Sequence, residues 1–243
     1  MWKSSPTLIF SSIPHRGAGG GELARAGMLR LLQWGRRRWP LRTISRREHD
    51  AAARLLAMVP ASRRWMADLG CGTGSAPARL RTEPCLGVDR SRRLVRVSRY
   101  AEAQRALCAD LAALPLRPDR FGLLLAIGVA EYCRDPEPLL REAARLLAHE
   151  GHLLLTVTPA GWHARFRRLL GSPVYIHQEE LLAGLFRKYH FLLKARQITA
   201  TQHLYLVISC ASADSMRSVA GSGVLRIDEE REEGRIFQNG DET

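Results

Sequence analysis

The stretch ADLGCGTG, residues 67–74, decides how this sequence folds. It places glycines at three alternate positions, Gly70, Gly72 and Gly74, directly after a short apolar run and directly before a helix-like stretch with Pro77 in its first turn. Two interpretations compete, a plain strand-to-helix turn and a loop that holds a nucleotide-like ligand. Glycines let the backbone adopt positive φ and let a ligand approach without a Cβ. The N-terminus of the following helix would add unpaired N–H groups.

Strand-like and helix-like patterns alternate through the middle of the chain. Strand-like apolar runs occur at about 65–69, 84–88, 106–108, 121–127 and 152–158, and helical stretches at about 74–81, 91–102 and 136–148. After Tyr189, the runs 191–200 and 201–210 follow each other with almost nothing between them, so they must pair as a hairpin. The sequence predicts an α/β fold: a Rossmann-like, doubly wound, mostly parallel seven-stranded sheet with a C-terminal antiparallel hairpin.

Composition divides the chain into four segments. They are a flexible N-terminal segment (1–27), a helical segment (28–60), the α/β domain (61–210) and a disordered tail (211–243). Within the second segment, a basic amphipathic helix precedes Pro40, and a second helix begins at Ser45, which forms a capping box with Glu48, and ends near Met58. These helices are expected to cover the ligand site; a surface helix that touches a membrane is the alternative.

The composition favours a single α/β domain in the cytoplasm. The chain has 243 residues, 46% of them hydrophobic. It shows neither a secretory signal nor an apolar run of the roughly 20 residues that cross a bilayer. The formal net charge of +13 attracts anions, whether nucleic acid, anionic lipid or an acidic metabolite. The cysteines lack paired spacing, so we expect reduced thiols and no metal site: Cys71, Cys85, Cys108, Cys133 and Cys210.

The glycine spacing separates two nucleotide-binding families. The dinucleotide fingerprint G-x-G-x-x-G requires its third glycine at Ser75, but here the third glycine is Gly74, and Asp68 stands two residues before Gly70. From ADLGCGTG onward the sequence resembles the class I S-adenosylmethionine-dependent methyltransferases, most closely those that methylate small molecules. The resemblance covers about residues 65–210 and implies S-adenosylmethionine as cofactor. The early third glycine and the terminal hairpin argue against a nicotinamide-dependent oxidoreductase.

The resemblance also implies which residues bind the cofactor. Asp89 ends the second strand 21 residues after Asp68, close to the roughly 20 expected for a ribose-binding acid. Asp110 would meet the adenine amino group, Leu111 would lie against the ring, and the end of the fourth strand would face the methyl donor. The implied cofactor-binding residues are Asp68, Gly70, Cys71, Gly72, Gly74, Asp89, Arg90, Asp110, Leu111 and Ile127.

Methyl transfer from a sulfonium does not require a catalytic side chain. The protein mainly aligns the nucleophile with the methyl carbon and sulfur, which can supply roughly 7–11 kcal/mol, and a general base is needed only if the acceptor loses a proton early. Candidates for such a base are Glu131 and Tyr132 after the fourth strand, and His163 and His177 after the fifth. A surface or packing role is the alternative for each.

The segment after the fifth strand is expected to bind the methyl acceptor. It interleaves aromatic and basic side chains, namely Trp162, Arg165, Phe166, Arg167, Arg168 and Tyr175. This mixture suits an apolar acceptor with an anionic group, a peripheral contact with an anionic membrane, or RNA. The fourth strand is followed by IGVAEY instead of the Asn- or Asp-Pro-Pro-aromatic run that is typical of enzymes that methylate the amino groups of bases. Methylation of pyrimidines at carbon 5 requires an activated cysteine, and Cys133 lacks the preceding proline of that motif.

We therefore expect methyl transfer to O, N or C of a small-molecule or lipid-like acceptor. An RNA methyltransferase and a non-catalytic S-adenosylmethionine-binding protein remain the alternatives. Strong salt-dependent RNA binding would favour the first of these.

Overall fold

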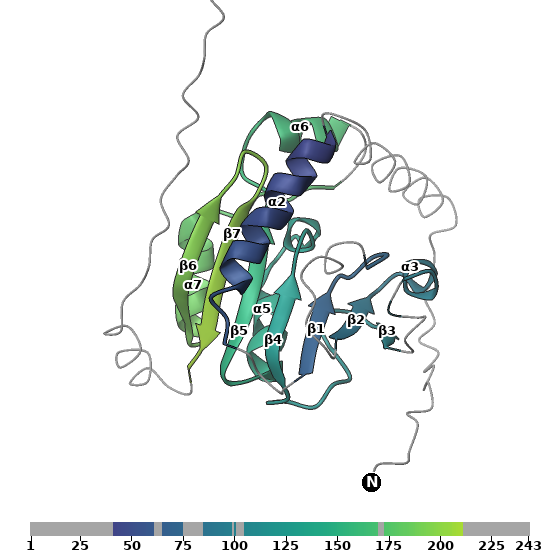
Figure 1. Cartoon of the computed structure of the whole chain (residues 1–243), viewed down its shortest axis with the longest axis vertical. Coiled ribbons are helices and arrows are strands. Elements are labelled where there is room, and N and C mark those ends of the chain that lie inside the picture. Colours follow the sequence, from purple (N-terminus) through teal and green to yellow (C-terminus); the bar gives the residue numbers. More distant parts are fainter. Residues whose placement is uncertain are drawn as a thin grey trace, which may run out of the picture.

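A seven-stranded sheet with the order β3-β2-β1-β4-β5-β7-β6 forms the centre of the protein (Figure 1). The computed structural model describes residues 41–60, 65–74, 85–98, 100, 105–169 and 173–210. The strands are β1 (Trp65–Leu69), β2 (Cys85–Asp89), β3 (Ala106–Cys108), β4 (Phe121–Ala126), β5 (Leu147–Val157), β6 (Phe191–Ile198) and β7 (His203–Ser209). The first five pair in parallel, and β7 is antiparallel to both β5 and β6. The predicted sheet and terminal hairpin are confirmed.

Helices cover both faces of this sheet. They are α2 (Leu41–Leu56), α3 (Arg92–Arg96), the 3-10 turn η2 (Ala130–Tyr132), α5 (Glu137–Leu146), α6 (Trp162–Leu169) and α7 (Glu179–Lys188). Figure 1 shows α2 across the face of β5 and β7, whereas α7 lies behind β6. Within the described ranges, no helix is long and apolar enough to span a membrane.

The core is divided between the two faces, and β4 contributes to both. Leu124 packs in the cluster that includes α5 and α7, whereas Leu125 packs in the cluster that includes Ala51 and Leu55 of α2. All six residues of β4 are buried for this reason. Two helical layers thus hold the central strands in place and leave the ends of the strands to form a site.

The predicted start of the second helix is wrong. The helix α2 begins at Leu41, so Ser45 is an interior helical residue and does not cap it. Glu48, the predicted partner in the capping box, instead accepts a hydrogen bond from Thr201 Oγ1 in the β6–β7 turn. A tertiary contact therefore uses the side chain that the local motif had assigned to the helix end. Of the predicted helix over 91–102, α3 covers only Arg92–Arg96.

Several predictions lie outside the described residues. These are the N-terminal segment 1–27, the helix before Pro40, the helix after the glycine bend from residue 75 onward, and the tail 211–243. Whether α2 helps to cover the cofactor stays a prediction. Its described contacts are with β5, β6 and β7.

Candidate cofactor and acceptor site

The glycine bend follows the carboxyl end of β1, and three of its residues have left-handed backbone conformations. Gly70, Gly72 and Gly74 have φ values of +75°, +53° and +74°, a conformation that favours glycine. Backbone hydrogen bonds fix the bend to the next strand, because Gly70 N and Cys71 N both donate to Val88 O, at 2.8 and 2.9 Å. The predicted bend is therefore formed, and it is tied to β2.

Two of the glycines serve different purposes. A Cβ on Gly70 would lie 2.3 Å from Cγ2 of Val129, so this glycine allows the bend to pack against the chain that follows β4. A Cβ on Gly72 would meet no atom within 4 Å among the described residues. Among the described residues, the backbone at Gly72 thus faces open space, as a ligand-binding loop requires.

Asp89 joins the end of β2 to this bend. Its Oδ2 accepts a hydrogen bond from Gly72 N at 2.9 Å, and its Oδ1 accepts one from Ser91 N at 2.8 Å. The side chain is buried with its residue only 9% exposed. A carboxylate has about four lone-pair sites, so both oxygens can accept further hydrogen bonds. A carboxylate beside the open face of Gly72 fits a ligand with hydroxyl groups, such as a ribose.

Asp68 lies beneath the bend and is buried. It accepts a hydrogen bond from the Tyr100 hydroxyl at 3.0 Å. Burial raises the pKa of the Asp68 carboxyl to about 7; the Tyr100 hydrogen bond opposes this shift, and the charge of Asp89 adds to it. Tyr100 also covers Gly87, where an added Cβ would lie 2.3 Å from its ring. No sequence motif singled out Tyr100, which fixes the acid from a distant part of the chain.

The remaining predicted cofactor residues follow the ends of the neighbouring parallel strands. Asp110 is exposed just after β3, and its Oδ1 accepts a hydrogen bond from Ala112 N at 2.9 Å. Leu111 is half-buried against the core, Arg90 is exposed after β2, and Ile127 is half-buried after β4. Because parallel strands end at the same edge of a sheet, these residues share an edge with the bend.

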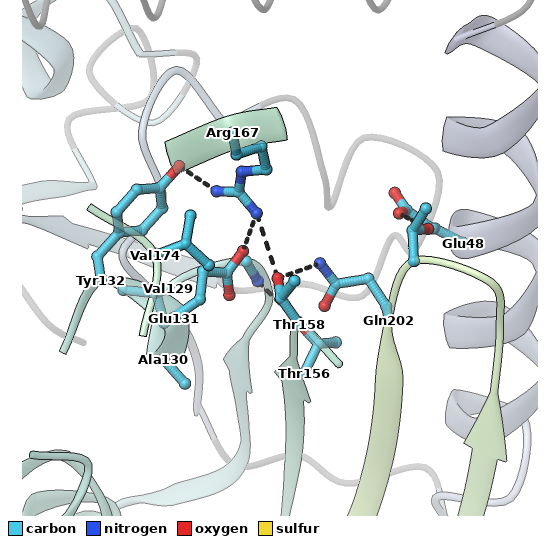
Figure 2. Close-up of polar contacts among 12 residues, drawn as sticks. Glu48, Val129, Ala130, Glu131, Tyr132, Thr156, Thr158, Arg167, Val174 and Gln202 are labelled. Atoms are coloured by element: carbon cyan, nitrogen blue, oxygen red, sulfur yellow. Dashed lines mark hydrogen bonds and ion pairs between the residues drawn. The ribbon is translucent and has the colours of Figure 1, made fainter. Parts of the chain in front are cut away.

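A buried polar network follows β4 at the same edge. Arg167 reaches from α6 to the η2 turn, where its Nη1 donates to Glu131 Oε1 at 3.0 Å and to Thr158 Oγ1 at 3.2 Å (Figure 2). Its Nη2 donates to the Tyr132 hydroxyl. Burial alone would lower the pKa of Arg167, but Glu131 and Tyr132 more than offset it, so the pKa is raised. Gln202 completes what we call the Glu131 network: its Nε2 donates to Thr158 Oγ1 at 3.3 Å.

Two oxygens of the Glu131 network have no hydrogen-bond partner among the described residues. They are Glu131 Oε2 and Gln202 Oε1, and both are buried. The sequence had pointed to Glu131 and Tyr132 as candidate groups and to Arg167 as one arginine of an aromatic-basic segment. It gave no signal for Thr158 or Gln202, which come from the end of β5 and the β6–β7 turn.

The two candidate histidines have different surroundings. The His163 ring packs edge-on against Trp162, with centroids 5.8 Å apart. His177 Nε2 lies 3.0 Å from Ala130 O, and nearby Tyr175 N donates to Glu131 O at 2.7 Å. The segment before α7 therefore holds the η2 turn in position, which is a packing role for His177.

The sequence comparison decides the family. Residues 67–155 match the methyltransferase domain family, and this range contains the bend, Asp89 and the Glu131 turn. This match identifies residues 67–155 as a class I S-adenosylmethionine-dependent methyltransferase domain. S-adenosylmethionine is the cofactor of this family, and the open backbone at Gly72 beside Asp89 fits it. The family match replaces the oxidoreductase alternative.

Known relatives of this methyltransferase match only part of it. The malonyl-[acyl-carrier protein] O-methyltransferase of Alcanivorax borkumensis is 35% identical over 102 residues, which cover 39% of this chain and 35% of that protein. The enzyme of the same name from Halorhodospira halophila is 32% identical over 118 residues, covering 44% of this chain and 40% of that protein. The chain thus spans well under half the length of the curated relatives it matches.

A solved methyltransferase shares the fold. The magnesium protoporphyrin IX methyltransferase from Synechocystis, a structure with bound SAH, superposes with a TM-score of 0.53 at 16% identity. The superposition covers 67% of this chain and 82% of the other. At this identity, the comparison supports the architecture alone.

Proposed function

We propose that this protein transfers a methyl group from S-adenosylmethionine to O, N or C of a small-molecule or lipid-like acceptor. The observation that carries the proposal is the backbone of Gly72, which is open on one side among the described residues. Its N–H donates a hydrogen bond to the buried carboxylate of Asp89. The curated relatives support the acceptor class, because they are named as O-methyltransferases of malonyl-[acyl-carrier protein].

In this proposal the bend and two acids bind the donor. The backbone of residues 70–74 holds the amino-acid end, and Asp89 accepts hydrogen bonds from the ribose hydroxyls, each worth about 1.5–3 kcal/mol. Asp110 faces the adenine amino group, with Leu111 against the ring. Asp68, held by Tyr100, supports the bend from below.

The acceptor binds beside the donor at the Glu131 network. When bound, S-adenosylmethionine supplies a methyl group on a positively charged sulfur, which is already activated for displacement. The chain contributes alignment, because the η2 turn packs against the bend through Val129 and Gly70. Burial raises the pKa of the Cys133 thiol, so this residue is not poised as the nucleophile that carbon-5 pyrimidine methylation requires.

Calorimetric titration with S-adenosylmethionine and with NADH tests the donor site. We expect binding of S-adenosylmethionine only. Asp89→Asn should weaken it by tenfold or more, because loss of a charge-assisted hydrogen bond costs on the order of 1.5–3 kcal/mol. Asp119→Asn is the matched control: Asp119 is exposed and precedes the amino end of β4. Binding of NADH, or equal affinity in wild-type protein and Asp89→Asn, would contradict the site.

Turnover is tested with labelled donor and a metabolite extract. The proposal predicts label in a small molecule or lipid with the wild type and much less with Asp89→Asn. Label in RNA would favour the RNA methyltransferase. Donor binding without transfer to any fraction would favour a non-catalytic binding protein.

A further inference from the structure

The Glu131 network contains two unsatisfied hydrogen-bond acceptors. Glu131 Oε2 and Gln202 Oε1 are buried without a partner among the described residues. The two residues are 1% and 7% exposed. Native proteins rarely leave buried polar oxygens unpaired, and those that remain call for an explanation. A ligand that donates hydrogen bonds would satisfy both.

The turn that carries Glu131 packs against the glycine bend of the predicted donor site. Glu131 follows Gly128, and a Cβ on Gly128 would lie 3.9 Å from Glu131 Oε1. Val129, between them, contacts Gly70 of the bend. Gln202 is connected to Glu131 through Thr158 and Arg167 (Figure 2). The bend is therefore connected through Val129 to the turn that carries Glu131, and Glu131 is connected by hydrogen bonds to Gln202.

The charges of the network disfavour an anionic acceptor. Arg167 Nη1 uses its two hydrogens on Glu131 and Thr158, and Nη2 donates to Tyr132. The positive charge of Arg167 is paired with Glu131, whose side chain is 2% exposed. A carboxylate would meet the like-charged Glu131 Oε2, and a buried like charge is costly. A hydroxyl or an amine would instead donate to it.

We propose that the methyl acceptor is a hydroxyl or amine compound that donates a hydrogen bond to Glu131 Oε2, with a second donor group on Gln202 Oε1. The inference rests on the proposed function and narrows its acceptor, and it departs from the malonyl carboxylate that the names of the curated relatives imply. With a hydroxyl acceptor, the O–CH₃ bond forms, and the donor's S–CH₃ bond breaks with its electron pair retained by sulfur. The hydroxyl proton passes to Glu131 Oε2, and Arg167 keeps its proton throughout.

The test uses four small probes on the full-length protein loaded with S-adenosylhomocysteine. They are phenol, benzyl alcohol, benzylamine and benzoate, whose binding is measured by saturation-transfer NMR titration. We expect phenol or benzylamine to bind at least about tenfold more tightly than benzoate. Benzoate that binds as tightly as phenol, or failure of all four probes to bind, would overturn the inference. Failure of the protein to bind S-adenosylhomocysteine at all would instead overturn the proposed function.

Two variants separate recognition from folding. Glu131→Gln alone leaves Arg167 buried without a counter-charge, so the charge-balanced double variant Glu131→Gln/Arg167→Gln is used. The double variant lacks the negative charge of Glu131 that repels a carboxylate, so its preference for phenol over benzoate should fall by about tenfold. Gln202→Met leaves the ion pair intact and should weaken phenol binding several-fold, with S-adenosylhomocysteine affinity within about twofold of wild type. A double variant that keeps the wild-type preference contradicts the role of Glu131.

Discussion

At the scale of single residues, two buried titratable groups oppose each other in their effect on stability. Burial raises the pKa of Asp68 from 3.8 to about 7. Burial, together with the charge of Lys194, lowers the pKa of His152 from 6.5 to about 4. Between about pH 4 and 6.5, the contribution of Asp68 to stability falls as pH rises, whereas the contribution of His152 rises. The two pH dependences therefore partly cancel. Separate variants are needed to reveal them.

Asp68→Asn should remove a destabilisation that grows with pH. The folded state binds more protons at Asp68 than the unfolded state between about pH 4 and 7, so its contribution to stability falls as pH rises through this range. Asparagine is uncharged and can still accept from Tyr100. The unfolding free energy of the variant minus that of wild type should increase from about pH 5 to 7 in urea denaturation and level off above. A difference that does not change with pH would refute this.

His152→Gln should show the opposite dependence. The unfolded state binds more protons at His152 between about pH 4 and 6.5, so this group costs stability as pH falls through that range. The variant should gain stability relative to wild type on acidification below about pH 6.5 and show a constant difference above. The same urea denaturation series measures it. A relative loss on acidification would show that the histidine is protonated in the folded protein.

At the scale of elements, the glycine bend and the η2 turn are locked together by one contact. Gly70→Ala would place a Cβ 2.3 Å from Val129 and add a side chain at a φ of +75°. We expect a loss of at least about 2 kcal/mol of stability, from overpacking and backbone strain. Val129→Ala in the same protein should recover part of this loss. Additive effects in this double-mutant cycle would show that the two elements are not coupled.

The elements that the sequence predicted are those with a local pattern. The alternating apolar runs and the adjacent C-terminal runs identified the strands and the hairpin. The glycine at the turn before the apolar part of β5 does not itself adopt the left-handed conformation. The positive φ of 61° falls on Glu150, whereas Gly151 is needed because a Cβ there would lie 2.8 Å from Ala148 O. The strand β5 accordingly begins at Leu147, before this turn.

Only those parts of the site that depend on short spacings along the chain could be predicted from the sequence. The bend and Asp89 follow from spacing along the chain. The contact of Asp68 with Tyr100 joins residues 32 apart, and that of Glu131 with Arg167 joins residues 36 apart. Such pairs depend on how the elements pack, and no periodicity encodes them. The capping box at Ser45 failed for the same reason, because the hairpin recruits Glu48.

At the scale of the whole molecule, the residues that we propose to bind the donor all lie in the α/β domain. The bend, Asp89 and Asp110 lie within residues 67–155, the range that matches the family. We therefore expect deletion of residues 1–27 to leave the affinity for S-adenosylmethionine within about twofold of the full chain in calorimetry. A large loss of affinity would assign part of the donor site to the N-terminal segment.

The central claim is that the open backbone at Gly72 receives the methyl donor, and calorimetric titration of Gly72→Asn with S-adenosylmethionine tests it most directly. Asparagine tolerates the φ of +53°, so its side chain should fill the space without unfolding the protein. Gly184→Asn is the control, because a Cβ at Gly184 also meets no atom of the described residues within 4 Å, but this glycine lies on α7. We expect Gly72→Asn to lose measurable binding and Gly184→Asn to bind as wild type does. Wild-type affinity in a folded Gly72→Asn would contradict it.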